Sequence, residues 1–380
     1  MNNFKYYIFI SLSLIKRVSR EKLYLNIIAP LLGYYHLFKI GTLDKVILPL
    51  IAMVFVNLIP TTINFTLVGY MKWAQFLGLV LFISFCSRFS IKGILSLISC
   101  VEAASVILYL IEFIFFEPYL MREFFKGQAF GRYAGIVGEP NFSALLFFIL
   151  FLINFHNKRY KNSILDLLLI IPTQSRTAYL VILLFALIRP LQRFVNKKVV
   201  LVIFAISQLY PYIVMYSWDY LNDDLKLKIA EKTADRYIIH AAHTDLNKYK
   251  ILGSGFGQFN DKFNFENIPT KYHNVIKMKN QNYTTKQQHN TPLQVLTEFG
   301  IVGLLFFSVF QVIIMNLCFK VDRNLALGWG LIFIFTLSLN TLSEVFIYVF
   351  ISYILICAKR NDESQTINFK ERFISLFKRS

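Results

Sequence analysis

HNTPLQVLTEFGIVG (His289 to Gly303) ends a long polar segment, and the hydrophobic helix pattern that it begins continues through Leu304 to Met315. Residues 218–290 form the only long polar segment of a chain that is 56% hydrophobic and 17% aromatic. Elsewhere, several runs of roughly 17–25 residues have almost no charge, the length a helix needs to cross about 30 Å of hydrocarbon. The runs do not alternate apolar and polar residues as barrel strands do. The sequence therefore predicts an all-α polytopic integral membrane protein.

We expect ten to twelve transmembrane helices. Ten crossings are predicted from Leu43 onward, at residues 43–63, 71–87, 93–116, 139–155, 162–173, 177–188, 199–217, 291–318, 325–340 and 342–358. Residues 23–38 are also apolar enough to cross, but a crossing there would place the basic cluster that includes Lys16 and Arg17 outside. Either this segment is re-entrant or interfacial, or the cluster is external against the usual bias.

The net charge of +18 comes from 40 basic and 22 acidic side chains, and much of the excess lies in short links between the predicted spans. Positive charge in short loops marks the cytoplasmic side. No basic domain stands apart from the spans, so nucleic acid is not an expected partner. This topology predicts four parts: N-terminal spans (1–217), an external loop or cap (218–290), C-terminal spans (291–358) and a cytoplasmic basic tail (359–380).

Three short motifs, far apart in the sequence, fall on the external side of this topology. GRYAGIVGEPNFSA (Gly131 to Ala144) carries Arg132, Glu139 and Asn141 into a span, and SRTAY (Ser175 to Tyr179) places Arg176 near the lipid boundary. An unpaired arginine there is costly unless it meets an anion or water. Each motif also has a purely structural interpretation: a helix start with an acidic residue at its positive end, or a snorkelling arginine.

The third motif is the opening stretch itself, which carries His289, Asn290 and Glu298. Its structural interpretation is a capped helix with glycines for close packing. GSGFGQF (Gly253 to Phe259), in the external segment, lacks the strand and the Lys-Ser/Thr of a nucleotide loop, so we interpret it as a turn that permits close backbone approach to the cap or to a sugar.

In order, spacing and sidedness, RYAGIVGEPN, SRTAY, GSGFGQF and HNTPLQVLTEFGIVG together resemble the O-antigen polymerase and O-antigen ligase superfamily, from about Arg132 to Gly303. The resemblance implies a multi-pass inner-membrane glycosyltransferase of the C type (GT-C-like). It would act at the periplasmic face on sugars attached to undecaprenyl diphosphate, with such glycolipids as donor and acceptor and a chain-length regulator as a further partner. By motif it assigns Arg176, His289 and Asn290 to the site, less firmly Arg132 and Glu139, and by looser spacing Arg236.

The chemistry of this class fits those residue types. Breaking the bond between an anomeric carbon and a lipid diphosphate releases a multiply charged anion, and arginines stabilise it by binding phosphate oxygens bidentately. The attacking hydroxyl needs a base, for which His289 has a suitable intrinsic pKa, with Glu139 or Glu298 as alternatives. We therefore predict His289 and Glu139 as catalytic, Arg132, Arg176 and Arg236 as diphosphate ligands, and Asn141, Asn290 and Glu298 as supporting residues.

Neither a metal nor another cofactor is expected. His240, His243 and Asp245 include a pair that could share a helix face, but no third ligand and no DxD pair is evident, and the four cysteines form no CxxC motif. Residues 225–243 have helical character, and the pair Asp223 and Asp224 just before them is interpreted as a solvated acidic turn.

Polymerisation of lipid-linked repeat units into O-antigen or capsule is the favoured function, because of the GEPN form of the first motif. The alternatives are ligation of glycan to lipid A core, transport of the same glycolipids, and a non-catalytic membrane subunit. Transport is disfavoured because neither inverted repeats nor charged residues within several mid-membrane spans are evident.

Overall fold

The computed structural model describes residues 27–64, 66–114, 132–133, 135–191, 197–233, 236–256, 269–273, 275, 290–337, 339, 341–342 and 344–377. Every regular element in these ranges is a helix, which confirms the all-α prediction for them. Five helical segments are long and apolar enough to cross a membrane, so this is a membrane protein by composition and helix length: Lys45–Ile63 (η2 Lys45–Ile47 with α3 Leu48–Ile63), α4 Leu67–Cys86, Ile91–Ile111 of α5 (Ile91–Ile114), α10 Lys197–Tyr220 and α15 Thr291–Val321.

The other five predicted crossings also coincide with helices. Three are apolar but shorter, namely α7 Pro140–His156, α9 Arg176–Ile188 and α16 Arg323–Thr336. α8 Tyr160–Ile170 is shorter still, and α17 Val345–Phe377 continues well past the predicted end of its crossing. The helix positions were thus predictable, whereas the total of ten to twelve spans stays a prediction.

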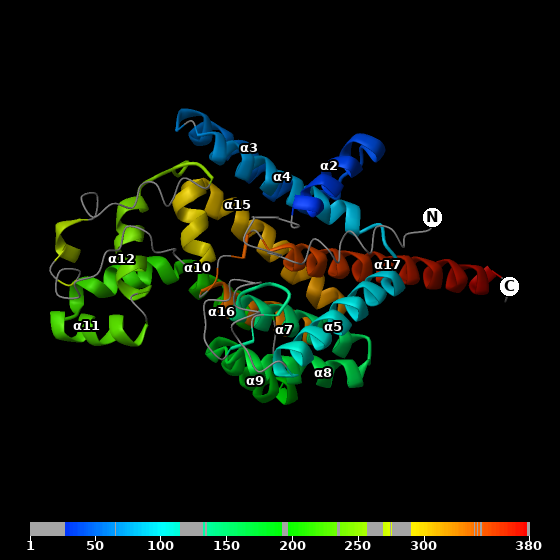
Figure 1. Ribbon diagram of the computed structural model, residues 1–380. Coiled ribbons are helices and arrows are strands. Elements are labelled where there is room, and N and C mark those ends of the chain that lie inside the picture. The colour runs from blue at the N-terminus through cyan, green and yellow to red at the C-terminus, as the bar shows by residue number, and fades with distance from the viewer. Residues whose placement is uncertain are drawn as a thin grey trace.

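The centre of the molecule is α7, whose residues Ala144–Ile153 are all buried. It packs against α8, α9, α16 and α17, while α15 packs against α3, α10, α16 and α17. In Figure 1, α2, α3 and α4 lie together on one side of the long helices α15 and α17, and α5, α7, α8 and α9 lie on the other. One continuous hydrophobic core joins these helices.

The N-terminal helix α2 (Ile28–Ile40) packs closely on α4 through two glycines. A Cβ on Gly33 would lie 2.1 Å from the Gly78 carbonyl oxygen, and one on Gly78 would lie 2.6 Å from Cβ of Pro30. Small residues let membrane helices approach in this way. With 13 residues, α2 spans only about 20 Å, less than the hydrocarbon thickness. Residues 1–26 lie outside the described residues, and both interpretations of this segment stay predictions.

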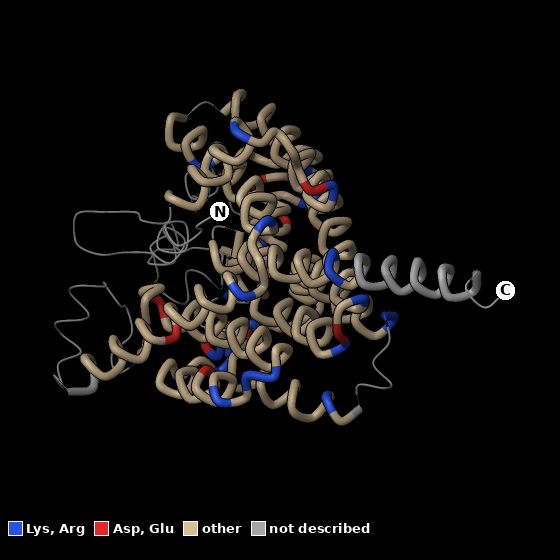
Figure 2. Tube along the Cα trace, turned by 90° about the vertical axis from the view of Figure 1, so that its right-hand side faces the viewer, with Lys and Arg blue, Asp and Glu red and all other residues tan. Residues whose placement is uncertain are grey.

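The molecule has two chemically distinct ends. At the first, which we call the basic end, the Tyr353 hydroxyl of α17 lies 2.5 Å from Nδ1 of His156 and accepts a hydrogen bond from Asn157, and Lys359 pairs with Asp44 at 2.6 Å. Viewed from the side that carries the C-terminus, the described trace shows many more Lys and Arg positions than Asp and Glu positions (Figure 2). The sequence-based topology predicts that this end is cytoplasmic, and that sidedness stays a prediction.

Helices α11 (Asp223–Lys232) and α12 (Arg236–Asn247) lie at the opposite end from the C-terminus (Figure 1). The expected helical character of residues 225–243 is therefore present, but it is divided between two helices. Asn222 caps α11, and Asp223 and Asp224 occupy its first turn, where acidic residues complement the helix dipole. The acidic pair is thus the start of a helix rather than a simple turn.

Two buried carboxylates correct the expectation that charged residues are absent from the mid-membrane spans. Glu102 of α5 and Asp166 of α8 are 3% and 0% exposed. The amide of Asn154 donates to both, at 2.5 Å and 2.8 Å, and Asn162 donates to the other oxygen of Glu102 at 2.5 Å. Glu102 is flanked by apolar and small residues, and Asp166 is followed by the apolar run 167–171, so a search based on hydropathy did not single out the pair.

Candidate functional site

The long span α15 is broken at Gly300, which has φ 71° and ψ −167°. Essentially only glycine adopts this region of backbone conformation. A Cβ at Gly300 would lie 2.3 Å from the carbonyl oxygen of Ile251 and 2.4 Å from the backbone nitrogen of Gly253. The residue therefore has to be glycine for two reasons, its backbone angles and the closeness of the segment that contains GSG.

That segment takes over the hydrogen bonds that the kink releases. The N–H groups of Ile301 and Val302 donate to the carbonyls of Lys250 and Ile251 at 3.0 Å and 3.1 Å, instead of to Thr297 and Glu298 one turn back. The carbonyls of Thr297 and Glu298 accept instead from the N–H groups of Ser254 and Gly255, at 2.9 Å and 3.0 Å. Two helical bonds are thus replaced by four bonds to residues 250–255, and the backbone at the kink stays satisfied inside the bundle.

Helix α3 holds the same segment from the other side. Asn57 donates its amide to the Glu298 carbonyl at 2.6 Å and accepts from the N–H of Phe256 at 3.1 Å, and Thr61 donates to Asn57. The ring of Phe256 stacks on Phe76, with 5.1 Å between centroids. The expected close backbone approach of the glycine-rich turn is present, and it is made to α15. Asn57 and Thr61 were missed, although two polar residues four apart in an apolar helix signal one shared polar face.

The first motif forms a compact polar cluster at the start of α7. Arg132 donates from Nε to the Thr173 carbonyl at 2.9 Å and from Nη2 to Asn141 at 3.1 Å. Asn141 donates to one oxygen of Glu139 at 2.9 Å, and the other oxygen accepts from the N–H of Phe142 at 2.8 Å. Glu139 is the N-cap of α7, and Pro140 occupies the first turn, as its missing N–H permits.

Arg236, the first residue of α12, extends this cluster. Burial lowers the pKa of its guanidinium, and the negative charge of Glu139 and the Tyr210 hydroxyl raise it again. An arginine stays protonated under any such balance. The fold therefore brings residues 132, 139, 141 and 236 into one electrostatic group, although Arg236 is far from the first motif in the sequence. The spacing of residues in the sequence could not show that Arg236 lies near Glu139.

Arg176 stands at the first position of α9, and its side chain is exposed. Ser175 caps the helix by accepting from the N–H of Ala178. The turn just before it is bonded to the first motif, because Tyr133 donates its N–H to the Pro172 carbonyl at 2.9 Å and Arg132 bonds to Thr173. The first two motifs are thus adjacent, and Arg176 lies three residues after Thr173, whose carbonyl bonds to Arg132.

The third motif begins α15 with Asn290 as its N-cap. Asn290 is fully buried, accepts from the N–H of Leu293 at 2.8 Å and donates to the Leu337 carbonyl at 3.1 Å. Thr291 donates to the Leu339 carbonyl at 2.7 Å. Asn290 is therefore the N-cap that the structural interpretation of this motif expects. His289, the residue before the cap, lies outside the described residues, and its role as the base stays a prediction.

Glu298 is 3% exposed and accepts from the side chain of Gln294 at 3.2 Å. Its carbonyl is the one shared by Asn57 and Gly255 at the kink. These contacts place it between the N-terminal half of α15 and the docked loop, where it supports the geometry of the helix.

Three capped helix starts, those of α7, α9 and α15, belong to the three motifs. Unpaired N–H groups and the macrodipole make the first turn of each helix electropositive. Combined with Arg132, Arg176 and Arg236, these starts give this end of the bundle the means to bind a multiply charged anion.

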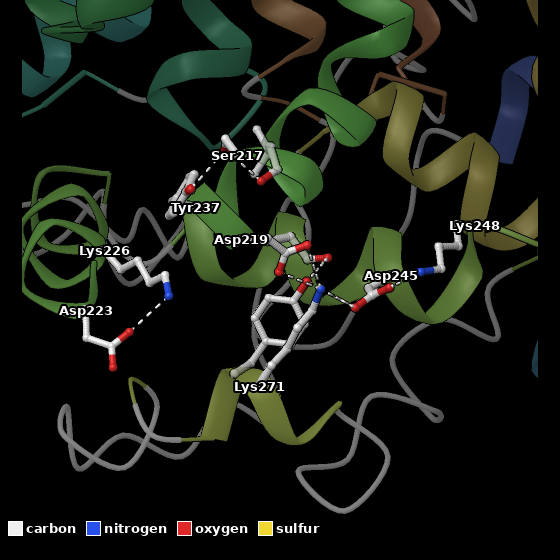
Figure 3. A network of polar contacts seen from close by, with 11 residues as sticks. Ser217, Asp219, Asp223, Lys226, Tyr237, Asp245, Lys248 and Lys271 are labelled. Carbon is white, nitrogen blue, oxygen red and sulfur yellow. Dashed lines mark hydrogen bonds and ion pairs between the residues drawn. The ribbon is translucent and has the colours of Figure 1, made fainter. Parts of the chain in front are cut away.

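A second polar network joins the short helix η6 (Thr270–Tyr272) to α10 and α12 (Figure 3). Lys271 pairs with Asp219 and Asp245, both at 3.1 Å, and Lys248 pairs with Asp245 at 2.7 Å. Asp245 is thus engaged by two ammonium groups, which makes it a poor metal ligand. Within the described ranges no group of three His, Cys, Asp or Glu side chains is placed to hold a metal ion.

His240 and His243 lie on the buried face of α12, each 1% exposed. Burial lowers the pKa of His243 well below its usual value, with further lowering from His240 and Lys250. Both histidines thus belong to the packed core of the external segment, together with Trp218, Tyr237 and Tyr272 nearby.

Comparison with known proteins gives a family match over part of the chain. No curated protein matches the chain. Residues 162–308, from α8 through the external segment to the first half of α15, match a family model described as O-Antigen ligase, which confirms the resemblance to the O-antigen polymerase and ligase superfamily over that part of the chain.

Proposed function

We propose that the protein is a membrane glycosyltransferase that polymerises undecaprenyl-diphosphate-linked oligosaccharide repeat units into O-antigen or capsule at the periplasmic face of a bacterial inner membrane. The observation that carries the proposal is the hydrogen-bonded cluster of Arg132, Asn141 and Glu139 at the end opposite the basic end, where the charge of Glu139 also acts on Arg236. The family match, which includes Arg176, Arg236 and residues 289–303, supports the same class of chemistry. The GEPN form of the first motif favours polymerase over ligase.

In this mechanism the arginines hold the diphosphate of the donor lipid. Their guanidinium groups and the three capped helix starts stabilise the charge that develops on the leaving diphosphate as the bond to the anomeric carbon breaks. The leaving group departs as an anion and needs no acid. His289 removes the proton from the acceptor hydroxyl, which forms the new glycosidic bond.

The hydrogen bonds of Glu139 favour a positioning role over that of the catalytic base. Both of its oxygens accept hydrogen bonds, one from the helix N–H and one from Asn141. It also balances the charge of Arg236. We therefore assign it as a positioning residue that orients Asn141, and through it Arg132, and we retain His289 as the favoured base.

Glycolipid analysis of a deletion strain tests the proposal. A polymerase predicts accumulation of single-repeat glycolipid or lipopolysaccharide, and restoration of long chains by the wild-type gene. Arg176→Ala should fail to restore chain growth while repeats are still exposed at the outer face, and Arg323→Ala, at the basic end, should restore it.

Other outcomes assign other functions. Long chains that remain on undecaprenyl diphosphate would identify a ligase, and repeats trapped inside the cell would identify a transporter. Full-length polymer with expressed His289→Ala protein would remove the catalytic assignment and favour a non-catalytic subunit.

A further inference from the structure

A groove at the basic end lies outside everything that the proposed reaction uses. It has a volume of about 580 Å³, within the range of about 300–1,000 Å³ that is usual for small-molecule sites. Its apolar lining comes from three helices, with Phe151 and Phe155 from α7, Ile164 and Leu167 from α8, and Ile182 and Ala186 from α9.

The groove opens outward from the bundle. Among the residues that line it, Ile164 is 58% exposed and Tyr160 is 56% exposed, so both side chains face the surroundings of the helices. The floor is aromatic, because Phe185 contacts both Phe151 and Phe155 edge-on, with centroids 5.4 Å and 6.1 Å apart. In a membrane, a groove of this kind between helices is filled by a hydrocarbon chain.

One end of the groove carries positive charge. The guanidinium carbon of Arg189 lies 4.4 Å from the centroid of the Phe155 ring, so a cation–π contact holds the group at the edge of the groove. A stacked guanidinium keeps its N–H groups in plane and available to phosphate oxygens. Tyr160 lies at the same edge, and no residue that lines this groove in the described chain is acidic.

Arg189 belongs to the basic end through a chain of contacts. Phe155 precedes His156, and the His156 ring meets Tyr353 of α17, six residues before Lys359. The charged edge of the groove is therefore at headgroup level on the side that the positive-inside rule makes cytoplasmic, where anionic lipids attract basic side chains.

We propose that this groove is a binding site for an anionic phospholipid of the cytoplasmic leaflet, with one acyl chain against Phe151, Phe155 and Phe185 and the phosphate at Arg189. Charge complementarity selects an anionic over a zwitterionic headgroup. The site is on the opposite side of the bundle from the transferase cluster, so the inference does not depend on the proposed function.

Native mass spectrometry of the full-length protein, purified in mixed micelles with equal phosphatidylglycerol and phosphatidylcholine, tests the site. Wild-type protein should retain phosphatidylglycerol preferentially. Arg189→Gln should weaken that retention about fivefold, the factor for one basic side chain near an anionic surface. Lys198→Gln removes an exposed charge from the start of α10 and should leave it unchanged. Ala186→Trp should reduce retention of both lipids, because the indole fills the groove.

Three results would overturn the proposal: equal retention of the two lipids by wild-type protein, equal effects of Arg189→Gln and Lys198→Gln, or displacement of phosphatidylglycerol by an equal amount of undecaprenyl phosphate. The last result would show that the groove holds an isoprenoid chain. Should Ala186→Trp fail to fold, the comparison of the two charge variants still decides the question.

Discussion

Replacement of Gly300 by alanine should detach the loop 250–256 from the kink of α15. Alanine in this backbone region costs about 1–3 kcal/mol, and its Cβ would lie 2.3 Å from the Ile251 carbonyl oxygen, a separation that atoms do not adopt. The helix can relieve the strain by straightening. It would then regain two helical hydrogen bonds and lose the four bonds to the loop.

The net loss is therefore two backbone hydrogen bonds, about 1–3 kcal/mol. Release of Phe256 from Phe76 and Phe299 removes two aromatic contacts, worth about 0.5–1.5 kcal/mol each. We expect Gly300→Ala to destabilise the protein by about 2–6 kcal/mol in total. It should also shorten or abolish the polymer, because the part of α15 before the kink, residues 291–299, would lose its direction.

Thermal unfolding in detergent, together with polymer length in a complemented deletion strain, measures both effects. Gly330→Ala is the matched control. Gly330 lies in the helical interior of α16, and the nearest atom to an added Cβ is a methyl carbon of Val200 at 3.1 Å. If the two variants unfold at the same temperature and support the same polymer, Gly300 does not need to be glycine and the account of the kink is incorrect.

Three further predictions address separate parts of the molecule. Asn57→Leu should lower the free energy of unfolding by about 1–3 kcal/mol, because it removes the buried amide that bonds to the N–H of Phe256 and to the Glu298 carbonyl. The control variant Thr62→Val, on the exposed face of α3, should be nearly neutral. Chemical denaturation of the two variants measures the difference. Arg132→Gln should weaken donor glycolipid binding by about 10–100-fold, equivalent to about 1.5–3 kcal/mol for a charged hydrogen bond, and an unchanged KM would contradict its role. His243 stays neutral in the folded protein, whereas the unfolded chain gains a proton at this residue as the pH falls below about 6.5. The free energy of unfolding should therefore decrease toward acidic pH by up to about 1.4 kcal/mol per pH unit. His243→Gln should reduce this pH dependence in thermal unfolding scans between about pH 7 and 5.

The positions of the helices were predictable because they depend on local properties. Charge-free length locates a span without knowledge of its neighbours. The start of α15 was readable as well: a capped helix is one interpretation of its motif, and Asn290 caps the helix by accepting from the N–H of Leu293.

The interior polar contacts were not predictable in the same way. Asn57 and Phe256 are 199 positions apart, and hydropathy cannot indicate that one satisfies the other. Glu102 and Asp166 were missed because they are far apart in the sequence, and only the packing of α5, α7 and α8 shows that they share Asn154. The kink at Gly300 belongs to the same class, since the helical pattern of the sequence continues through it and only the docked loop explains its backbone angles.

The dependence of α15 on residues 250–256 has a consequence for how the site is assembled. The kink is stable only while the external segment occupies it, because four of its backbone groups bond to that segment instead of to their own helix. The same segment continues from α12, which begins with Arg236, and α15 begins at Thr291, two residues after His289. Docking of residues 250–255 therefore fixes the segment that follows α12 and the first turns of α15 together. Any substitution that loosens residues 250–256 should therefore disturb α12, which begins with Arg236, and the start of α15, which Asn290 caps, together.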